Sequence, residues 1–311
     1  MILNTGSRTD IPACYSDWFY NRIKEGYVLT RNPYYPTQVT KYILRPEVVD
    51  MIVFCTKNPF PMLERLSLLS AFDMFWFVTI TPYGQEIEPH VPPGELVIDY
   101  FKQLSEQIGK KRLSWRYDPV FITDRYPVDY HIEQFCQMAR ALSGYTEQCV
   151  VSFLDLYEKT LRNFNKARSV TKDEQEKIIA AFSEIAVEYK LQIHLCCENP
   201  KLIRKNVDAD GCMSKAVLEK ALGCKLLVPQ KKTARKECDC LLGADIGAYN
   251  TCGHGCLYCY ANYNSEIVAK NQKLHNPASP LLIGELSKND VIKQVEQKSW
   301  KNGQMDFFDL L

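Results

Sequence analysis

The residues most suited to chemistry are Cys252, Cys256 and Cys259, three thiols spaced C-x3-C-x2-C. Gly253 and Gly255 between them allow the tight backbone turns that bring three sulfurs to one centre. Thiolates of this kind select zinc or iron–sulfur clusters. Three ligands are one fewer than the four thiolates of a closed structural zinc site or a simple electron-transfer cluster. The spacing therefore predicts a metal centre with one open coordination position, which catalysis requires.

Further thiols gather between residues 208 and 247, where the sequence becomes irregular. A C-x-C pair at 238 to 240 is a common way to supply two thiolates to one centre. We predict a second centre, a [4Fe-4S] cluster in the first place and zinc in the second, with the ligands Cys197, Cys212, Cys238 and Cys240. In the alternative, these four are small buried residues. Cys196 and Cys224 are further available thiols for which the same buried role is the alternative, and a core role is expected of Cys14, Cys55, Cys136 and Cys149.

The elements that must position these groups repeat along the first two-thirds of the chain. Seven short apolar runs each end in a polar cluster and precede a helix-like stretch: residues 2–5, 27–30, 51–55, 75–80, 112–115, 149–153 and 191–196. Near-continuous apolar strands of this kind are typical of a parallel sheet covered on both faces. We therefore predict an α/β fold, a TIM-like (β/α) barrel, complete or partial, rather than an open doubly wound sheet. Residues 225–228 or 246–249 are the candidates for an eighth strand.

Domain boundaries follow from this pattern. A (β/α) barrel core is expected at 1–207, a Cys-rich iron–sulfur segment packed on the barrel mouth at 208–265, and a C-terminal helix and tail at 266–311. Among the helices, Thr171 and Glu174 form a capping box before an apolar stripe. Another helix should begin at Pro93 and stop at Gly109.

Polar side chains directly follow the predicted strands. In a barrel the active site lies where strands end and βα loops begin, so these side chains should face one mouth. Four cations and four acids are expected there: Arg8, Asp10, Arg31, Lys57, Arg116, Asp118, Asp155 and Glu198. They could orient a small polar substrate or a cofactor; in the alternative, some are ion pairs or caps at the rim. Arg116 and Asp118 are the first candidates for catalysis, and Glu198 is the next.

The cysteine triplet, with Tyr258 as the aromatic residue of C-x3-C-x-(aromatic)-C, resembles the signature of the radical S-adenosylmethionine superfamily. In that superfamily the three cysteines hold three irons of a [4Fe-4S] cluster, and the fourth iron binds S-adenosylmethionine, which is cleaved to a 5'-deoxyadenosyl radical. The resemblance implies cofactor contacts from Tyr258, Arg31 and Asp155, with Tyr258 against the adenine. It also implies an electron donor such as flavodoxin or ferredoxin.

The triplet usually lies near the N-terminus in that superfamily, whereas here about 250 residues precede it. This position, together with S-R-T-D-I-P near the start and W-R-Y-D-P in the middle, resembles an uncharacterised bacterial family with a radical-SAM-type triplet at its C-terminal end. The closer resemblance covers nearly the whole chain. It implies a fold and a cofactor but no known substrate.

Composition limits the remaining function classes. The 38 Lys and Arg residues balance 37 Asp and Glu, so no overall charge favours nucleic acid or an anionic membrane. No apolar run approaches the ~20 residues of a membrane span, and no secretion signal is recognised. We therefore expect a cytoplasmic protein whose 13 cysteines are reduced. Hydrolase and nucleotide-binding motifs such as G-x-S-x-G, the P-loop and G-x-G-x-x-G are absent from the sequence.

Two further hypotheses compete with a radical enzyme. The first is a non-radical metal-binding protein, either a zinc-stapled scaffold or an electron-transfer module. The second rests on residues Gln304 to Phe308, which resemble the peptide by which bacterial DNA-repair and replication proteins bind the sliding clamp. A tail that folds back on its own domain is the alternative explanation for those five residues.

Overall fold

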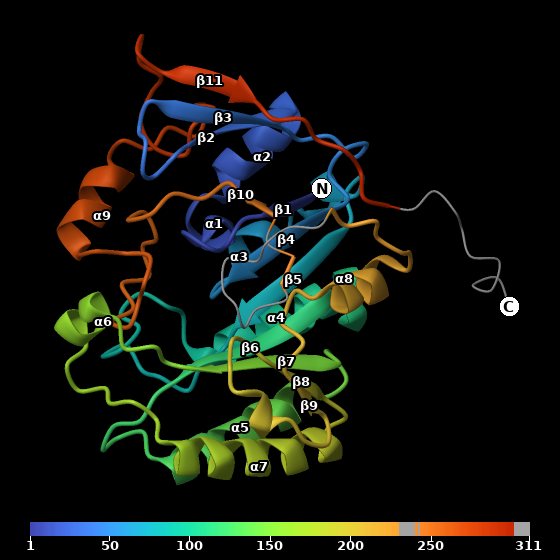
Figure 1. The fold of residues 1–311 in the computed structure, drawn as a ribbon, viewed down its shortest axis with the longest axis vertical. Helices are drawn as coiled ribbons and strands as arrows, with labels where there is room; N and C mark the ends of the chain where they lie inside the picture. Colours follow the sequence, from blue (N-terminus) through green and yellow to red (C-terminus); the bar gives the residue numbers. More distant parts are fainter. Residues whose placement is uncertain (230–239, 242, 302–311) are drawn as a thin grey trace, which may run out of the picture.

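The computed structural model describes residues 1–229, 240–241 and 243–301 (Figure 1). Its main sheet has eight strands, and every neighbouring pair is parallel. The strand order is β10 (Ala244–Asp245), β1 (Ile2–Asn4), β4 (Met51–Thr56), β5 (Met74–Thr79), β6 (Leu113–Val120), β7 (Gln148–Phe153), β8 (Gln192–Leu195) and β9 (Val207–Asp208). From β1 to β9 each strand lies beside the next one of this sheet along the chain. The predicted α/β fold with a parallel sheet is confirmed.

In the part of the chain that the structure describes, the main sheet does not close into a barrel. Within the described residues β10 pairs only with β1, and β9 pairs only with β8, so both outer edges stay open. Each of these two strands is only two residues long and offers few backbone groups for further pairing. The prediction of a complete barrel is therefore wrong. Of the two predicted positions of an eighth strand, 225–228 has only an isolated bridge from Leu226 to Lys301. The observed strand β10 at Ala244–Asp245 lies directly before 246–249, and the Ile246 N–H still donates to the Asn4 carbonyl of β1.

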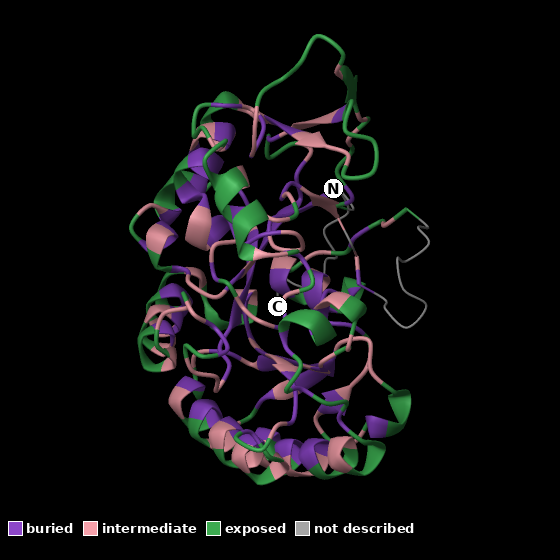
Figure 2. Cartoon of the chain, turned by 90° about the vertical axis from the view of Figure 1, so that its left-hand side faces the viewer, coloured by how far each residue is buried: buried purple, intermediate pink, exposed green. Residues whose placement is uncertain are grey.

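Apolar strands and amphipathic helices form one core. All six residues of β5 are buried, as expected for a strand covered on both faces. Helices α5 (Val128–Leu142) and α7 (Lys172–Glu188) lie side by side below β7 (Figure 1), where the Phe135 and Phe182 rings stack at 3.8 Å between centroids. Figure 2 shows buried residues alternating with exposed ones on these lower helices. Such large buried rings supply most of the apolar area removed from water.

Two predicted helix boundaries are confirmed. Thr171 caps α7, and the reciprocal bonds of the capping box with Glu174 are both present. Helix α4 (Gly94–Ile108) follows Pro93 and ends at Gly109, whose φ of 85° lies in the region that favours glycine. These local signals depend only on neighbouring residues, so they can be recognised from the sequence.

The run at residues 27–30 is not part of the main sheet. It forms β2 (Tyr27–Arg31), which pairs antiparallel with β3 (Gln38–Ile43), and β11 (Val291–Gln294) adds to β3 in parallel. The link between β2 and β3 is too short for the crossover that a parallel pair requires, so a hairpin forms.

The remaining elements are short. They are the helices α1 (Ile11–Cys14), α2 (Ser16–Glu25), α3 (Phe60–Leu63), α6 (Glu158–Asn163), α8 (Lys215–Leu222) and α9 (Ser265–Gln272), with 3-10 turns at Leu66–Leu69, Lys110–Arg112 and Pro200–Leu202. In the described part of the chain, no helix is long and apolar enough to cross a membrane. The residues proposed to bind a sliding clamp, Gln304 to Phe308, lie outside the described residues.

Candidate functional site

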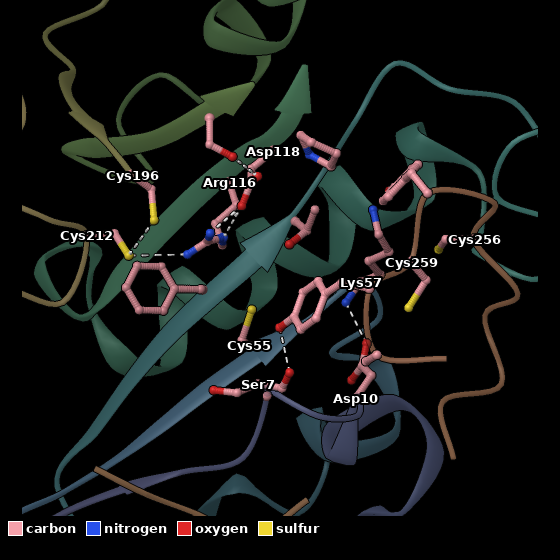
Figure 3. A pocket seen from close by; sticks show the side chains of 18 of the residues that line it. Ser7, Asp10, Cys55, Lys57, Arg116, Asp118, Cys196, Cys212, Cys256 and Cys259 are labelled. Atoms are coloured by element: carbon pink, nitrogen blue, oxygen red, sulfur yellow. Dashed lines mark hydrogen bonds and ion pairs between the residues drawn. The ribbon is translucent and has the colours of Figure 1, made fainter. Parts of the chain in front are cut away.

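A cavity of about 440 Å³ opens at the carboxyl ends of the main-sheet strands (Figure 3). Fourteen of the sixteen residues selected from the sequence line it: Arg8, Asp10, Lys57, Arg116, Asp118, Asp155, Cys197, Glu198, Cys212, Cys240, Cys252, Cys256, Tyr258 and Cys259. Cys238 lies outside the described residues. Parallel strands deliver their carboxyl ends to one edge, and this is why residues so distant in the chain meet here.

Arg31 was selected from the sequence together with these residues, but its side chain lies elsewhere. Its guanidinium forms two hydrogen bonds with the Asp290 carboxylate, at 2.6 and 2.8 Å, beside the small three-stranded sheet. Arg31 is not among the residues that line the cavity. The predicted cofactor contact of Arg31 is therefore not supported, because the strand that carries it belongs to the other sheet.

Strand β6 directs its polar side chains into the cavity. Trp115 stacks on Phe135 of α5, whereas Arg116 and Asp118 point to the other face, as the two-residue period of a strand requires. The R-Y-D-P sequence thus lies inside β6, although the sequence suggested that the strand ended at Trp115. Arg116 Nε donates to Asp118 at 3.0 Å, and the hydroxyl of Ser152 also donates to Asp118.

Glu198 lies across the cavity edge after β8. Its carboxylate accepts a hydrogen bond of 2.7 Å from the backbone N–H of Phe153. Burial raises the pKa of Glu198 to about 7, and the nearby charges of Asp155 and Asp118 act in the same direction. A carboxyl group with a pKa near neutrality can both donate and accept a proton, which agrees with its selection as a candidate for catalysis.

A buried network fixes the aromatic residue of the cysteine triplet. The Glu88 carboxylate accepts hydrogen bonds from Lys57 Nζ at 2.9 Å, from the Thr81 hydroxyl at 2.7 Å and from the Tyr258 hydroxyl. Burial opposes the charge on Lys57, but Glu88 and the nearby Cys256 raise the pKa of Lys57, so it stays protonated. Both Lys57 and Tyr258 therefore have partners within the protein, and Lys57 acts on the triplet by positioning it.

The triplet loop is also tied to the start of the chain. His254 Nε2 lies 2.8 Å from Asp10, which caps α1 and accepts the Lys57 backbone N–H. Burial alone would lower the pKa of His254, but the bond to Asp10 and its charge raise it to about 9. The hydroxyl of Tyr260 donates to the Ser7 carbonyl at 2.5 Å. Figure 3 shows Ser7, Asp10 and Cys259 on the same side of the cavity.

The three thiols of the triplet are protonated when no metal is bound. A hydrogen bond with Cys14, followed by burial, raises the pKa of Cys252. Burial raises the pKa of Cys256 and of Cys259, although the charge of Lys57 lowers the pKa of Cys256 in part. Because thiolates are the metal-binding form, metal binding here must release protons.

Cys14 was expected in the core, yet it contacts the triplet. Cys14, Cys252 and His254 each place a ligand atom within 4.8 Å of the other two, an arrangement that could hold a metal ion. The bond from His254 to Asp10 occupies the Nε2 atom of this histidine. In an iron–sulfur cluster each thiolate binds a different iron, so the sulfur atoms of the ligands need not lie this close to one another.

A second set of cysteines lies on the other side of the cavity (Figure 3). The sulfur of Cys212 is 3.8 Å from that of Cys196 and 3.6 Å from that of Cys240. Cys197, one of the predicted ligands, also lines the cavity. Cys196, an available thiol that the predicted ligand set left out, lies directly after β8 where the chain enters the cavity edge.

Sequence reasoning missed several residues in or around the cavity, for two different reasons. Cys55 and Cys196 sit at the carboxyl ends of strands, where the alternation of inward and outward side chains could have identified them. Glu88 and Ser7 lie in loops, and no spacing rule connects them to the triplet. Only the folded chain brings Glu88 to Tyr258 and the Ser7 carbonyl to Tyr260.

A protein-family model described as a domain of unknown function, DUF1848, matches residues 2–261. The chain belongs to this family. No curated protein matches the chain. The predicted resemblance to an uncharacterised family is thereby confirmed, whereas the family description contains no activity and does not bear on the radical S-adenosylmethionine superfamily.

The residues matched by the DUF1848 model include all residues that line the cavity. The first and last residues that line it, Asn4 and Ala261, both lie within the match. Helix α9 and strand β11 follow after its end. The cavity with both cysteine sets is therefore part of the family domain.

Proposed function

We propose that this DUF1848 protein is a radical S-adenosylmethionine enzyme that acts on a small polar substrate. The observation that carries the proposal is the position of Cys252, Cys256 and Cys259, which line the same cavity as Arg116 and Asp118. A metal site on the outer surface of the sheet would have no access to a substrate held at these strand ends. The cavity volume of about 440 Å³ falls within the range of small-molecule sites.

The residues of the triplet suit a [4Fe-4S] cluster. All three sulfurs are partly shielded from water and belong to one short loop, in which the Cys259 N–H donates to the Cys256 carbonyl at 3.2 Å. Gly255 adopts a φ of 71° between two of the ligands, which a residue with a side chain would resist. When bound, the cluster together with S-adenosylmethionine supplies a 5'-deoxyadenosyl radical for hydrogen abstraction.

In this proposal the side chains around the cavity bind and orient the substrate and S-adenosylmethionine. Arg116 and Asp118 are proposed to orient the polar substrate, because both project from β6 into the cavity. Glu198, whose pKa is about 7, is proposed to exchange a proton with it. Arg8, Asp155 and Tyr258 line the cavity and are proposed to contact S-adenosylmethionine.

Asp10 and Lys57 have a different role in this proposal. Each is bonded to a residue of the triplet loop or to the carboxylate that holds it. They are therefore positioning residues, which hold the cysteines over the strand ends. Reduction of the cluster requires a one-electron donor, for which flavodoxin or ferredoxin is proposed.

The proposal is tested with full-length protein reconstituted with iron and sulfide in the absence of oxygen. Dithionite and S-adenosylmethionine should give 5'-deoxyadenosine with the wild-type protein and none with Cys256→Ala. The matched control is Cys136→Ser on α5, which does not line the cavity and should retain activity. Far-UV circular dichroism of Cys256→Ala should match the wild type. Continued 5'-deoxyadenosine production by folded Cys256→Ala would contradict the assignment.

One observation favours a non-radical metal protein as the second candidate. The short separations among Cys14, Cys252 and His254 suit a single ion better than a cluster. This alternative predicts that Cys14→Ser removes the metal, whereas Cys256→Ala and Cys259→Ala retain it. The radical proposal predicts the opposite pattern, because Cys14 is not one of its three ligands.

A further inference from the structure

The cysteines opposite the triplet form a compact group of their own. Cys196 follows β8, Cys212 precedes α8, and Cys240 precedes β10, so three separate segments bring their sulfurs together. All three line the cavity, and Cys212 and Cys240 are buried. Figure 3 shows Cys196 and Cys212 beside Arg116 and well apart from Cys256 and Cys259.

Two of the three sulfur separations match one ion better than a cluster; the three sulfurs do not all lie within 4.8 Å of one another, so the outer two must approach when the ion binds. A tetrahedral zinc ion with metal–sulfur bonds of about 2.3 Å places two thiolates about 3.8 Å apart. The observed separations are 3.8 Å for Cys196 and Cys212 and 3.6 Å for Cys212 and Cys240. Thiolates on a [4Fe-4S] cluster bind different irons and stand farther apart.

Two hydrogen-bond donors are placed to offset negative charge on these sulfurs once a metal is bound. Arg116 Nη1 donates to the Cys212 sulfur at 3.5 Å, and the backbone N–H of Met213 donates to the Cys240 sulfur at 3.3 Å. Hydrogen bonds of this kind orient thiolate ligands and offset their charge around a metal. Three thiolates on a divalent ion leave one negative charge, and the Arg116 guanidinium lies beside it.

We propose that Cys196, Cys212 and Cys240 bind a single zinc ion whose fourth position faces the cavity. This site differs from the predicted second centre in its ligands, because Cys196 replaces Cys197 and Cys238, and its metal is zinc, the second of the two predicted alternatives. An open fourth position beside Arg116 suits an anionic donor of the substrate, such as a carboxylate or a thiolate. The site does not depend on radical chemistry at the triplet.

The test compares metal contents of full-length proteins purified without oxygen. The wild type should contain stoichiometric zinc in addition to iron. Cys212→Ser should lose the zinc and keep the iron, whereas the triple variant Cys252→Ala/Cys256→Ala/Cys259→Ala should lose the iron and keep the zinc. Cys136→Ser is the control and should keep both metals. Failure of the radical proposal would alter only the iron results, so the two proposals are tested separately.

A second measurement uses the wild-type protein alone, in case Cys212→Ser does not fold. Metal-free protein is treated with iodoacetamide with and without added zinc, and the modified cysteines are mapped by mass spectrometry. Zinc should protect Cys196, Cys212 and Cys240 together. Wild-type protein that takes up no zinc, zinc that remains in Cys212→Ser, or a lack of protection at these three thiols would each overturn the proposal. A disulfide between two of them without metal would also overturn it.

Discussion

The Glu88→Gln substitution is expected to destabilise the fold and loosen the triplet loop. Glu88 is almost fully buried, with 4% of its side chain exposed, and it pairs with Lys57, which is 12% exposed. The glutamine keeps the shape and one acceptor oxygen, so the hydroxyls of Thr81 and Tyr258 can still donate to it. What is lost is the charge that compensates Lys57.

The size of the effect follows from burial. Removing one partner of a buried ion pair costs about 3–5 kcal/mol, because the other charge stays buried without compensation. The lower end, about 3 kcal/mol, is expected because Lys57 retains some contact with water. Removing both charges in Lys57→Met/Glu88→Gln should cost less than Glu88→Gln alone. The exposed pair of Lys177 and Asp129 provides the control, since Asp129→Asn should leave stability within error.

Urea denaturation of the metal-free protein, in the presence of a chelator and a reductant, measures these differences through tryptophan fluorescence. The same variants should then be reconstituted, and Glu88→Gln should bind less iron than the wild type because Tyr258 is held less firmly. A loss below about 1 kcal/mol for Glu88→Gln would refute the argument from the buried pair. The argument would also be refuted if Lys57→Met/Glu88→Gln were less stable than Glu88→Gln.

Three further predictions concern other parts of the chain. Burial lowers the pKa of His131 to about 4. Between pH ~4 and pH ~6.5 the unfolded chain therefore binds one proton more than the folded protein, so the free energy of unfolding should fall by ~3 kcal/mol as the pH decreases across that window. His131→Gln should flatten this part of the pH dependence in urea titrations. Arg31→Ala should leave 5'-deoxyadenosine production unchanged, whereas Arg8→Ala should reduce it because Arg8 lines the cavity and is proposed to contact S-adenosylmethionine; an inactive Arg31→Ala would restore Arg31 to the site. Thr171→Ala should lower the unfolding free energy by about 1 kcal/mol through loss of the cap, and unchanged thermal unfolding would argue against this.

Some of the site could be predicted because its residues follow a local rule. Arg116 and Asp118 are two apart on a strand, so they share a face, and the end of a parallel strand is where such a face becomes accessible. Arg31 satisfies the same local rule and lies elsewhere. The difference is the short link after β2, which pairs this strand with β3 and takes Arg31 to Asp290.

The cysteines illustrate the same division. Spacing predicted that Cys252, Cys256 and Cys259 act together, and all three line one cavity. Spacing could not identify Cys14 as a neighbour of Cys252, because 238 residues separate them in the chain and only packing brings them together. The strand-end position of Cys196 could have been predicted, but its contact with Cys212 could not, because that contact depends on the path of the segment after β8.

By itself, the sequence determined the parallel α/β architecture, the helix caps and the groups of residues that are close along the chain. Each of these depends on backbone periodicity or on hydrogen bonds between near neighbours, which act over a few residues. Tertiary structure alone decided that the sheet stays open, that Arg31 leaves the site and that Glu88 holds Tyr258. These outcomes depend on pairing between distant segments, where competing partners differ in free energy through packing and burial that no local pattern records.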